Sequence, residues 1–399
     1  MQLPGFAQEN SLDYYINQGL AHSPLLKDIR NQENSNAVDS LLIKAGQKPQ
    51  VSYNGLLYYA PVINGLGYSD VLTNISNITT VAYASQRIFN QKSIEAQYSK
   101  LDLENQTLRI SSKITENDLR KAITLQYLIA CSVSNDLSFD MELLASSKDE
   151  EIILKQLVEK GHYKQVDYFS FMFELKTQEL LLSDLQIQYQ KEVSALKVLC
   201  GLPDSVDEQL TWPEIKLNMP VNTANSPFFE RFTVDSLKIQ NEKFLIGRNY
   251  KPSVNWFSDA GLVNNLPRDI SKNFGFSVGL NLSVPIYDGQ QRKLNYKKLE
   301  IAENTRINYA DHFKQQFNRQ LQQRYTELKK TQELIPKVKE QLGFAESVIK
   351  QDKYLLNTGN ISITDYVTAL RNYVSVKRNM NQYQVKILQI ITEINYWNQ

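Results

Sequence analysis

The clearest pattern of apolar and polar positions runs over residues 274–286, where apolar side chains alternate strictly with small or polar ones. Alternation with a period of two predicts a β-strand that has one apolar and one polar face. A transmembrane barrel strand has this pattern over about 9–11 residues, and an amphipathic strand of a soluble sandwich has it too. In the barrel interpretation, the membrane-facing residues are Phe274, Phe276, Val278, Leu280 and Leu282.

A second pattern has the period of a helix. Leu321, Leu328, Ile335, Leu342 and Ile349 lie seven positions apart and predict a coiled-coil stripe along a long helix over 290–357. Pro336 lies within this stripe, so we expect a bend or an open backbone hydrogen bond there.

Similar reasoning places the remaining elements. We expect helices over about 10–45, 90–160, 165–199, 228–248 and 364–397, and strands within 49–89 and 251–287. The segment from Asn90 to Lys160 contains no Pro and no Gly, which favours one uninterrupted helix. Residues 1–8 are expected to be a remnant of a processed secretory signal or a disordered start.

The chain also repeats itself. Gly161 and Asp167 recur as Gly359 and Asp365, 198 positions later, and the segment at Ile88 recurs at Ile286 with the same offset. A duplicated unit of this size predicts two structural repeats, 9–202 and 228–399, joined by the Pro-rich segment 203–227.

The repeat sets the number of strands and so the assembly. Two repeats give four strands, which are too few to close a barrel, and a membrane does not tolerate open sheet edges. A cyclic trimer would supply about twelve strands, a number within the range of outer-membrane barrels. The fold class expected is therefore mainly α with a β-barrel portion, with long antiparallel coiled-coil helices attached to the strands.

Composition and motifs argue against several classes of function. Lys and Arg number 44 and Asp and Glu 43, so the chain has no basic excess with which to bind nucleic acid. The three histidines lie far apart in sequence without metal-ligand spacing, and no phosphate loop or nucleophile motif occurs. We expect no enzyme, no cofactor and no metal.

The residues from Leu282 to Gly289, together with the duplicated Gly-to-Asp turns, resemble the TolC-like outer-membrane factors of efflux and secretion systems. The Asn- and Tyr-rich sequence resembles a Bacteroidetes-type member of that family. The resemblance covers residues 10–399. It identifies the junction between strand and helix with Pro285, Tyr287, Asp288 and Gly289.

The resemblance implies a homotrimer whose barrel lies in the outer membrane and whose helical tube extends into the periplasm. Such a channel is a passive exit duct of a tripartite efflux or type I secretion system. Its partners would be a periplasmic adaptor protein and an inner-membrane pump of the RND or ABC type.

The resemblance also assigns roles to the turns. The residues expected to form the adaptor-docking tip are Gly161, His162, Gly359, Asn360, Ser362 and Thr364. Asp167 and Asp365 would lie at the narrow entrance, where a threefold ring of carboxylates favours cations. From the residues alone, these glycines and hydroxyls equally suit ordinary helix caps.

A different class of function remains open at this point. A soluble, elongated coiled-coil scaffold or tether with a small β-domain would also contain long polar helices. Extraction distinguishes the two, because a scaffold leaves membranes in high salt and a barrel requires detergent.

Overall fold

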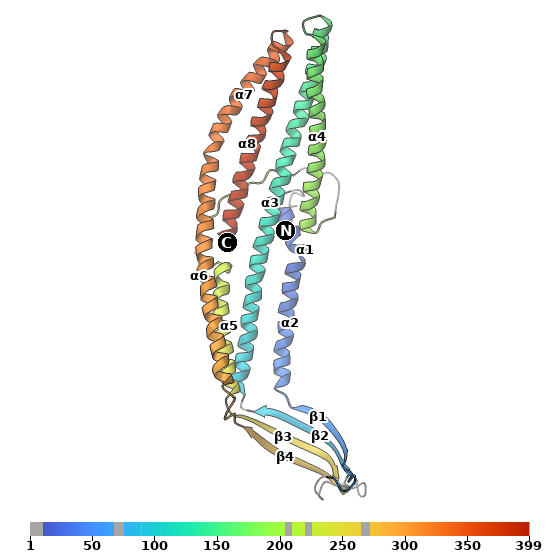
Figure 1. The fold of residues 1–399 in the computed structure, drawn as a ribbon, viewed down its shortest axis with the longest axis vertical. Helices are drawn as coiled ribbons and strands as arrows, with labels where there is room; N and C mark the ends of the chain where they lie inside the picture. The colour runs from blue at the N-terminus through green and yellow to red at the C-terminus, as the bar shows by residue number, and fades with distance from the viewer. Residues whose placement is uncertain are drawn as a thin grey trace, which may run out of the picture. The chain divides into compact units, whose positions relative to one another are not determined.

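A computed structural model describes residues 11–67, 76–88, 90–203, 210–219, 226–264 and 272–398 (Figure 1). The helices within this part of the chain are α1 Leu12–His22, α2 Pro24–Gly46, α3 Gln91–Glu159, α4 Gln165–Cys200, α5 Pro227–Asn249, α6 Gln291–Gln332, α7 Leu334–Asn357 and α8 Ile363–Trp397. The strands are β1 Gln50–Tyr59, β2 Ser76–Ile88, β3 Ser253–Asn264 and β4 Phe274–Ser283. The expectation for residues 1–8 and much of the expected joint over 203–227 lie outside the described residues.

Three expected elements are shorter or more divided than the sequence suggested. The helix expected over 10–45 is two helices, because Pro24 disfavours helical backbone at Ser23. Ser23 instead caps α2, and its Oγ accepts a hydrogen bond from the Leu26 N–H at 3.4 Å. The strand expected to reach residue 287 ends at Ser283, since Pro285 has no N–H to give to a sheet.

The long helix expected over 290–357 is also divided, at Glu333. Pro336 follows three residues later, and its missing N–H and its ring disrupt the backbone bonds of the preceding turn. The expected opening of the helix near Pro336 is therefore confirmed. The heptad stripe is confirmed too, because Leu328 is buried and Leu321, Ile335, Leu342 and Ile349 are partly buried.

The chain folds into two compact units, and each takes segments from both halves of the sequence. The helical unit comprises residues 1–28, 111–229 and 311–399, and the sheet unit comprises 29–110 and 230–310. The division of the chain into two sequence repeats stays a prediction, because the compact units do not follow it.

Three apolar clusters form the core of the helical unit. One joins α1, α3 and α4 through Tyr15, Ile123, Tyr127 and Leu196, which are fully buried. A second lies where α3, α4, α7 and α8 meet and contains Leu154, Phe171, Leu356, Ile363 and Tyr366. The third packs α6 on α8 through Leu328, Ile390, Ile391 and Ile394.

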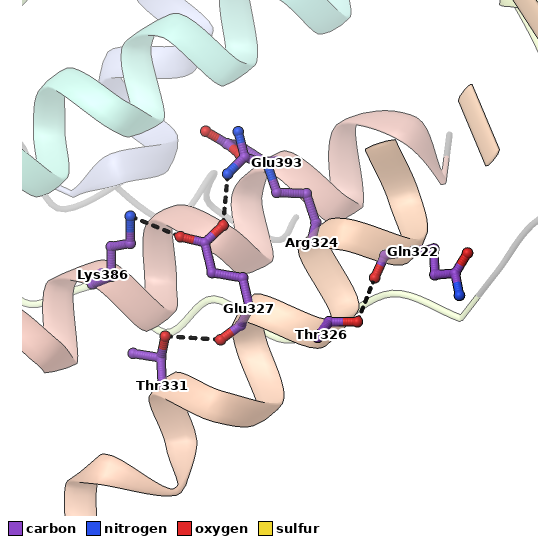
Figure 2. A network of polar contacts seen from close by, with 7 residues as sticks. All are labelled: Gln322, Arg324, Thr326, Glu327, Thr331, Lys386 and Glu393. Atoms are coloured by element: carbon purple, nitrogen blue, oxygen red, sulfur yellow. Dashed lines mark hydrogen bonds and ion pairs between the residues drawn. The ribbon is translucent and has the colours of Figure 1, made fainter. Parts of the chain in front are cut away.

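A polar network flanks the third cluster and ties α6 to α8 (Figure 2). Glu327 accepts from Lys386 Nζ at 2.9 Å and from Arg324 Nη1 at 2.7 Å, and Arg324 Nε lies 2.5 Å from Glu393 Oε2. The bonds from Lys386 and Arg324 hold the pKa of the Glu327 carboxyl below its ordinary value. These side chains are partly exposed, so the network sets the register of the two helices more than it adds stability.

The sheet unit contains one antiparallel sheet in the order β1-β2-β3-β4. All of β1 pairs with β2, and all of β4 pairs with β3. The central strands β2 and β3 pair from Ile78↔Asn264 to Ile88↔Val254. The sheet therefore has two outer strands, β1 and β4, each with one edge unpaired within the described residues.

Candidate functional site

The helical turns at Gly161 and Gly359 have the same backbone geometry. Each glycine has a positive φ, 79° at Gly161 and 72° at Gly359, a conformation that an L side chain adopts only with strain. After α3, the N–H of His162 donates to the Leu157 carbonyl at 2.9 Å, and after α7 the N–H of Asn360 donates to the Leu355 carbonyl at 2.9 Å. Both helices thus end in a Schellman motif closed by glycine.

The helices that follow begin differently. At the start of α8, Ser362 is the N-cap, and its hydroxyl accepts from the Thr364 N–H at 3.2 Å. At the start of α4 the N-cap is Lys164, and the Asp167 carboxylate accepts from the Lys164 backbone N–H at 3.1 Å. The expected cap role of Ser362 is therefore visible. Asp167 caps the start of α4, while Asp365 is exposed in the first turn of its helix.

The structure brings the two turns together within the helical unit. A Cβ built on Gly359 would lie 3.6 Å from the Cβ of His162, so the histidine lies against the second turn. The Tyr163 hydroxyl lies 3.2 Å from the Leu356 carbonyl oxygen and 3.0 Å from that of Ile361. Tyr163 donates to these carbonyls and so links the two hairpins at their ends.

Behind the second turn lies a buried polar group. Glu150 of α3 is 2% exposed, and it accepts from the Tyr366 hydroxyl and pairs with Lys353 Nζ at 2.7 Å. Ser146 completes the set, because its hydroxyl donates to Glu150 at 3.2 Å and accepts from Lys353 at 2.7 Å. Burial, and then the charge of Glu150, raise the pKa of Tyr366 well above its ordinary value.

The matching tyrosine of the first turn binds the neighbouring carboxylate. Tyr168 donates to Glu151 at 2.7 Å, and both side chains are only partly buried. A further bridge connects the two hairpins, since Arg371 of α8 donates to Glu174 of α4 at 2.6 Å and 2.9 Å. The charge of Asp365 adds to burial in raising the pKa of Asp352.

In the sheet unit, the register gathers apolar side chains on one face. Paired residues of antiparallel strands share a face, so Val278 of β4 lies on the same face as Ala84 of β2 and Val51 of β1. The apolar face comprises Val51, Tyr53, Leu57 and Tyr59 of β1, Ile78, Ala82 and Ala84 of β2, Val254, Trp256, Ala260 and Leu262 of β3, and Phe274, Phe276, Val278, Leu280 and Leu282 of β4.

That face is uncovered within the described chain. The β4 residues expected to face lipid are between 64% and 82% exposed, and Leu57 of β1 is 76% exposed. The opposite face is mostly small or polar near its centre, with residues such as Ser52, Ser85, Asp259 and Ser277. An apolar face of this extent, left open by the chain itself, marks a surface that lipid or another molecule must cover.

The expected junction residues follow β4 directly. Gly289 has a φ of 64°, and the Asp288 carboxylate caps α6 by accepting from the Arg292 backbone N–H at 2.7 Å. This bond contributes most to lowering the pKa of Asp288. Pro285 ends the sheet, and Tyr287 is 84% exposed.

Both a part of the sequence and the whole fold are similar to known proteins. Residues 257–394, about a third of the chain, match the family model described as outer membrane efflux protein. The whole fold is similar to the outer-membrane channel OprN, with a TM-score of 0.78 at 13% identity over 97% of this chain and 89% of that one. By fold the chain is TolC-like, and residues 257–394 match the outer membrane efflux protein model.

Other TolC-like structures agree. The outer membrane protein VceC from Vibrio cholerae aligns with a TM-score of 0.76 at 14% identity, over 97% of this chain and 96% of that one. The CmeC channel of Campylobacter jejuni aligns with a TM-score of 0.77 at 11% identity, over 97% and 85%. Compared by sequence with curated proteins, the chain matches none.

The expectation that this TolC-like chain is no enzyme agrees with these comparisons, because the family and the matched structures are channels. Within the described residues, no group of three His, Cys, Asp or Glu side chains could hold a metal ion. Cys131 and Cys200 are both buried and both free.

No helix in the described part of the chain is long and apolar enough to cross a membrane.

Sequence reasoning missed the residues that join the two hairpins. Tyr163, Tyr366 with Glu150, and Arg371 with Glu174 connect segments about two hundred positions apart. One signal was available, because Tyr168 and Tyr366 follow the two repeated aspartates directly.

Proposed function

We propose that the protein is a homotrimeric outer-membrane channel with a periplasmic helical extension, which serves as the passive exit duct of an efflux or secretion system. The observation that carries the proposal is the apolar face shared by the strands β1 to β4. In the part of the chain that the structure describes, the outer strands β1 and β4 of this sheet each have an unpaired edge. Lipid accepts an apolar face, but it does not accept unpaired backbone groups.

Three copies resolve the problem of the edges. If β4 of one copy pairs with β1 of the next, three sheets of four strands close into a barrel of about twelve strands without edges. Ten-residue strands such as β1 and β4 have the length that a barrel strand needs to cross a membrane at a tilt of about 45°.

The turns at Gly161 and Gly359 are the proposed docking tip for a periplasmic adaptor. His162, Asn360, Ser362 and Thr364 are exposed there, and Tyr163 holds the two turns side by side. Complementary side chains of a partner could therefore contact both turns at once. Asp167 and Asp365, repeated in three copies, are the proposed acidic residues of the entrance.

The duct itself contains no chemistry, so an inner-membrane pump must supply the energy and choose the cargo. An RND-type or ABC-type pump fits the proposal equally, and cargo would be small molecules for efflux or polypeptides for type I secretion.

The first test combines extraction, mass and conductance. We expect release from membranes only in detergent, a particle of three chains by light scattering after subtraction of the detergent, and ion-conducting pores in planar bilayers. A monomer that leaves membranes in high salt and forms no pores would overturn the proposal in favour of a soluble coiled-coil tether.

A further inference from the structure

The polar face of the sheet carries a pair of stacked aromatic rings. Tyr83 of β2 and Phe257 of β3 lie with ring centroids 6.0 Å apart and ring planes 19° from parallel. Both side chains are half-buried, so part of each ring remains accessible. They lie on the face opposite Phe276 and Val278, because their register partners are Asp259 and Gly279.

The outer end of the Phe257 ring reaches the neighbouring strand β4 at Gly279. A Cβ built on Gly279 would come within 2.6 Å of the Phe257 ring, so only glycine leaves room for the ring in this position. Glycine opposite an aromatic ring on a paired strand is a known way to stabilise a sheet. That role explains why Phe257 lies against Gly279, but it does not explain why part of the ring remains accessible.

A carboxylate stands beside the rings. Asp259 pairs directly with Tyr83 on one side and with Ser277 on the other, and the Ser277 hydroxyl donates to Asp259 Oδ2 at 2.5 Å. Among the described residues no Lys or Arg forms an ion pair with Asp259, and Arg87 pairs with Asn255, four positions away along β3. Asp259 therefore places a carboxylate next to two aromatic rings, without an ion pair to a Lys or Arg of the described chain.

Aromatic ring faces attract cations, most strongly those that are weakly hydrated, and a nearby carboxylate adds to the attraction. Strongly hydrated small ions gain little binding free energy from an aromatic ring. Alkylammonium and aromatic ammonium groups are attracted both by the rings and by the carboxylate.

We propose that Tyr83, Phe257 and Asp259 form a binding site for organic cations on the inner face of the barrel, repeated once in each copy. The inference rests on the proposed function, since that function makes this face the wall of the duct. Such a site would retain amphiphilic ammonium compounds weakly on their way out and would not retain organic anions of the same size.

The test measures how far an added organic ion reduces the single-channel current through the trimer in planar bilayers. The solution on both sides contains potassium chloride. Phenyltrimethylammonium is the probe, and benzenesulfonate, an aromatic anion of similar size, is the control. We expect the cation to reduce the current and the anion to leave it unchanged.

Variants locate the block. Phe257→Leu should raise the half-blocking concentration of phenyltrimethylammonium by about three- to fivefold, as expected from loss of one cation–π contact. Asp259→Asn keeps the shape of the side chain and its acceptor for Ser277, and it should weaken the block at least as much. Phe276→Leu makes the same substitution on the apolar face and should leave the block unchanged.

The outcomes separate the two proposals. The cation site is overturned if the cation and the anion block wild-type pores equally. It is also overturned if the cation blocks pores of Phe257→Leu and Asp259→Asn as strongly as wild-type pores. In both cases the channel proposal stands. Absence of pores from the wild type overturns the channel and the site together. If Phe257→Leu does not assemble, Asp259→Asn and Tyr83→Leu decide the question.

Discussion

The turns at Gly161 and Gly359 share their backbone hydrogen bonds but differ in what anchors the helix that follows. After Gly359, Tyr366 reaches a buried carboxylate, Glu150, which Lys353 also contacts. After Gly161, Tyr168 donates to Glu151, which follows Glu150 in α3 and is only partly buried. One copy of the turn is thus fixed to the core, and the other is fixed near the surface.

The two turns therefore show which residue a tight turn requires, and which residues around it are free to differ. A left-handed residue after the helix is required in both places, so glycine occurs in both. The residues that cap and anchor the next helix are under no such common requirement, and here they differ between the two turns. The comparison predicts that α8 is held more firmly than α4 at this end of the helical unit.

The largest expected effect comes from removing the two tyrosine hydroxyls. Tyr366→Phe should lower the free energy of unfolding by about 2 kcal/mol, because buried Glu150 loses a donor. Tyr168→Phe should lower it by less than about 1 kcal/mol, since water replaces the lost bond. Urea unfolding of both variants in detergent measures the difference, and equal losses would contradict the distinction between the two turns.

Alkaline pH should sharpen the same contrast. The pKa of Tyr366 is raised in the folded chain, so above pH of about 10 the unfolded chain ionises this tyrosine while the folded chain keeps it neutral. Its contribution to stability is therefore complete below pH 10 and falls above it by up to about 1.4 kcal/mol per pH unit.

Other buried groups titrate in the same range and serve as a common background. Burial raises the pKa of Tyr127, Cys131 and Cys200 to about 12. Tyr366→Phe should flatten the fall in stability between pH 10 and 11 relative to the wild type. Tyr168→Phe should flatten it less, because the bond to Glu151 raises the pKa of Tyr168 too, but at a partly exposed position. Unfolding curves at closely spaced pH values test this, and parallel curves for all three proteins would show that Tyr366 is not the group responsible.

The glycines should respond alike. Gly161→Ala and Gly359→Ala each force alanine into the left-handed region at a cost of about 1 kcal/mol or slightly more. An added methyl at Gly359 meets His162 at an ordinary contact distance of 3.6 Å, so no extra clash is expected there. A loss at Gly359 that exceeds the loss at Gly161 by more than about 1 kcal/mol would indicate that the backbone needs of the turns differ.

The smallest effect concerns the aspartates. Asp167→Ala removes a cap from the Lys164 N–H and should cost about 1 kcal/mol. Asp365→Ala loses only a favourable position near a helix N-terminus, worth about 0.3 kcal/mol or slightly more, and it relieves repulsion with Asp352. Urea unfolding at pH 7 compares them, with Asp311→Ala, a replacement on α6, as a matched control for loss of one carboxylate.

Local patterns accounted for the elements that one segment determines by itself. The heptad from Leu321 to Ile349, the alternation from Phe274 to Leu282 and the two turn glycines all correspond to what the structure has at those positions. Each of these features depends on residues within a few turns or on a single strand, so the sequence contains its full cause.

Features that depend on pairing between distant segments were beyond reach. The apolar face of β1, β2 and β3 does not stand out in any one of these strands, and it appears only when the register aligns Val51, Ala84 and Val278. The bond from Tyr366 to Glu150 likewise joins residues 216 positions apart. The break at Ser23 is a different case, because it has a local cause: Pro24 disfavours helical backbone at the residue before it.

The pairing of β2 with β3 also has a consequence for how the chain reaches its native state. β2 ends at Ile88 and β3 begins at Ser253, so the centre of the sheet cannot form until most of the polypeptide has been made or transported. Contacts between such distant segments form slowly, since a long loop must close first. During that delay the β1–β2 hairpin presents unpaired strand edges and apolar side chains, which makes it the segment most in need of a chaperone.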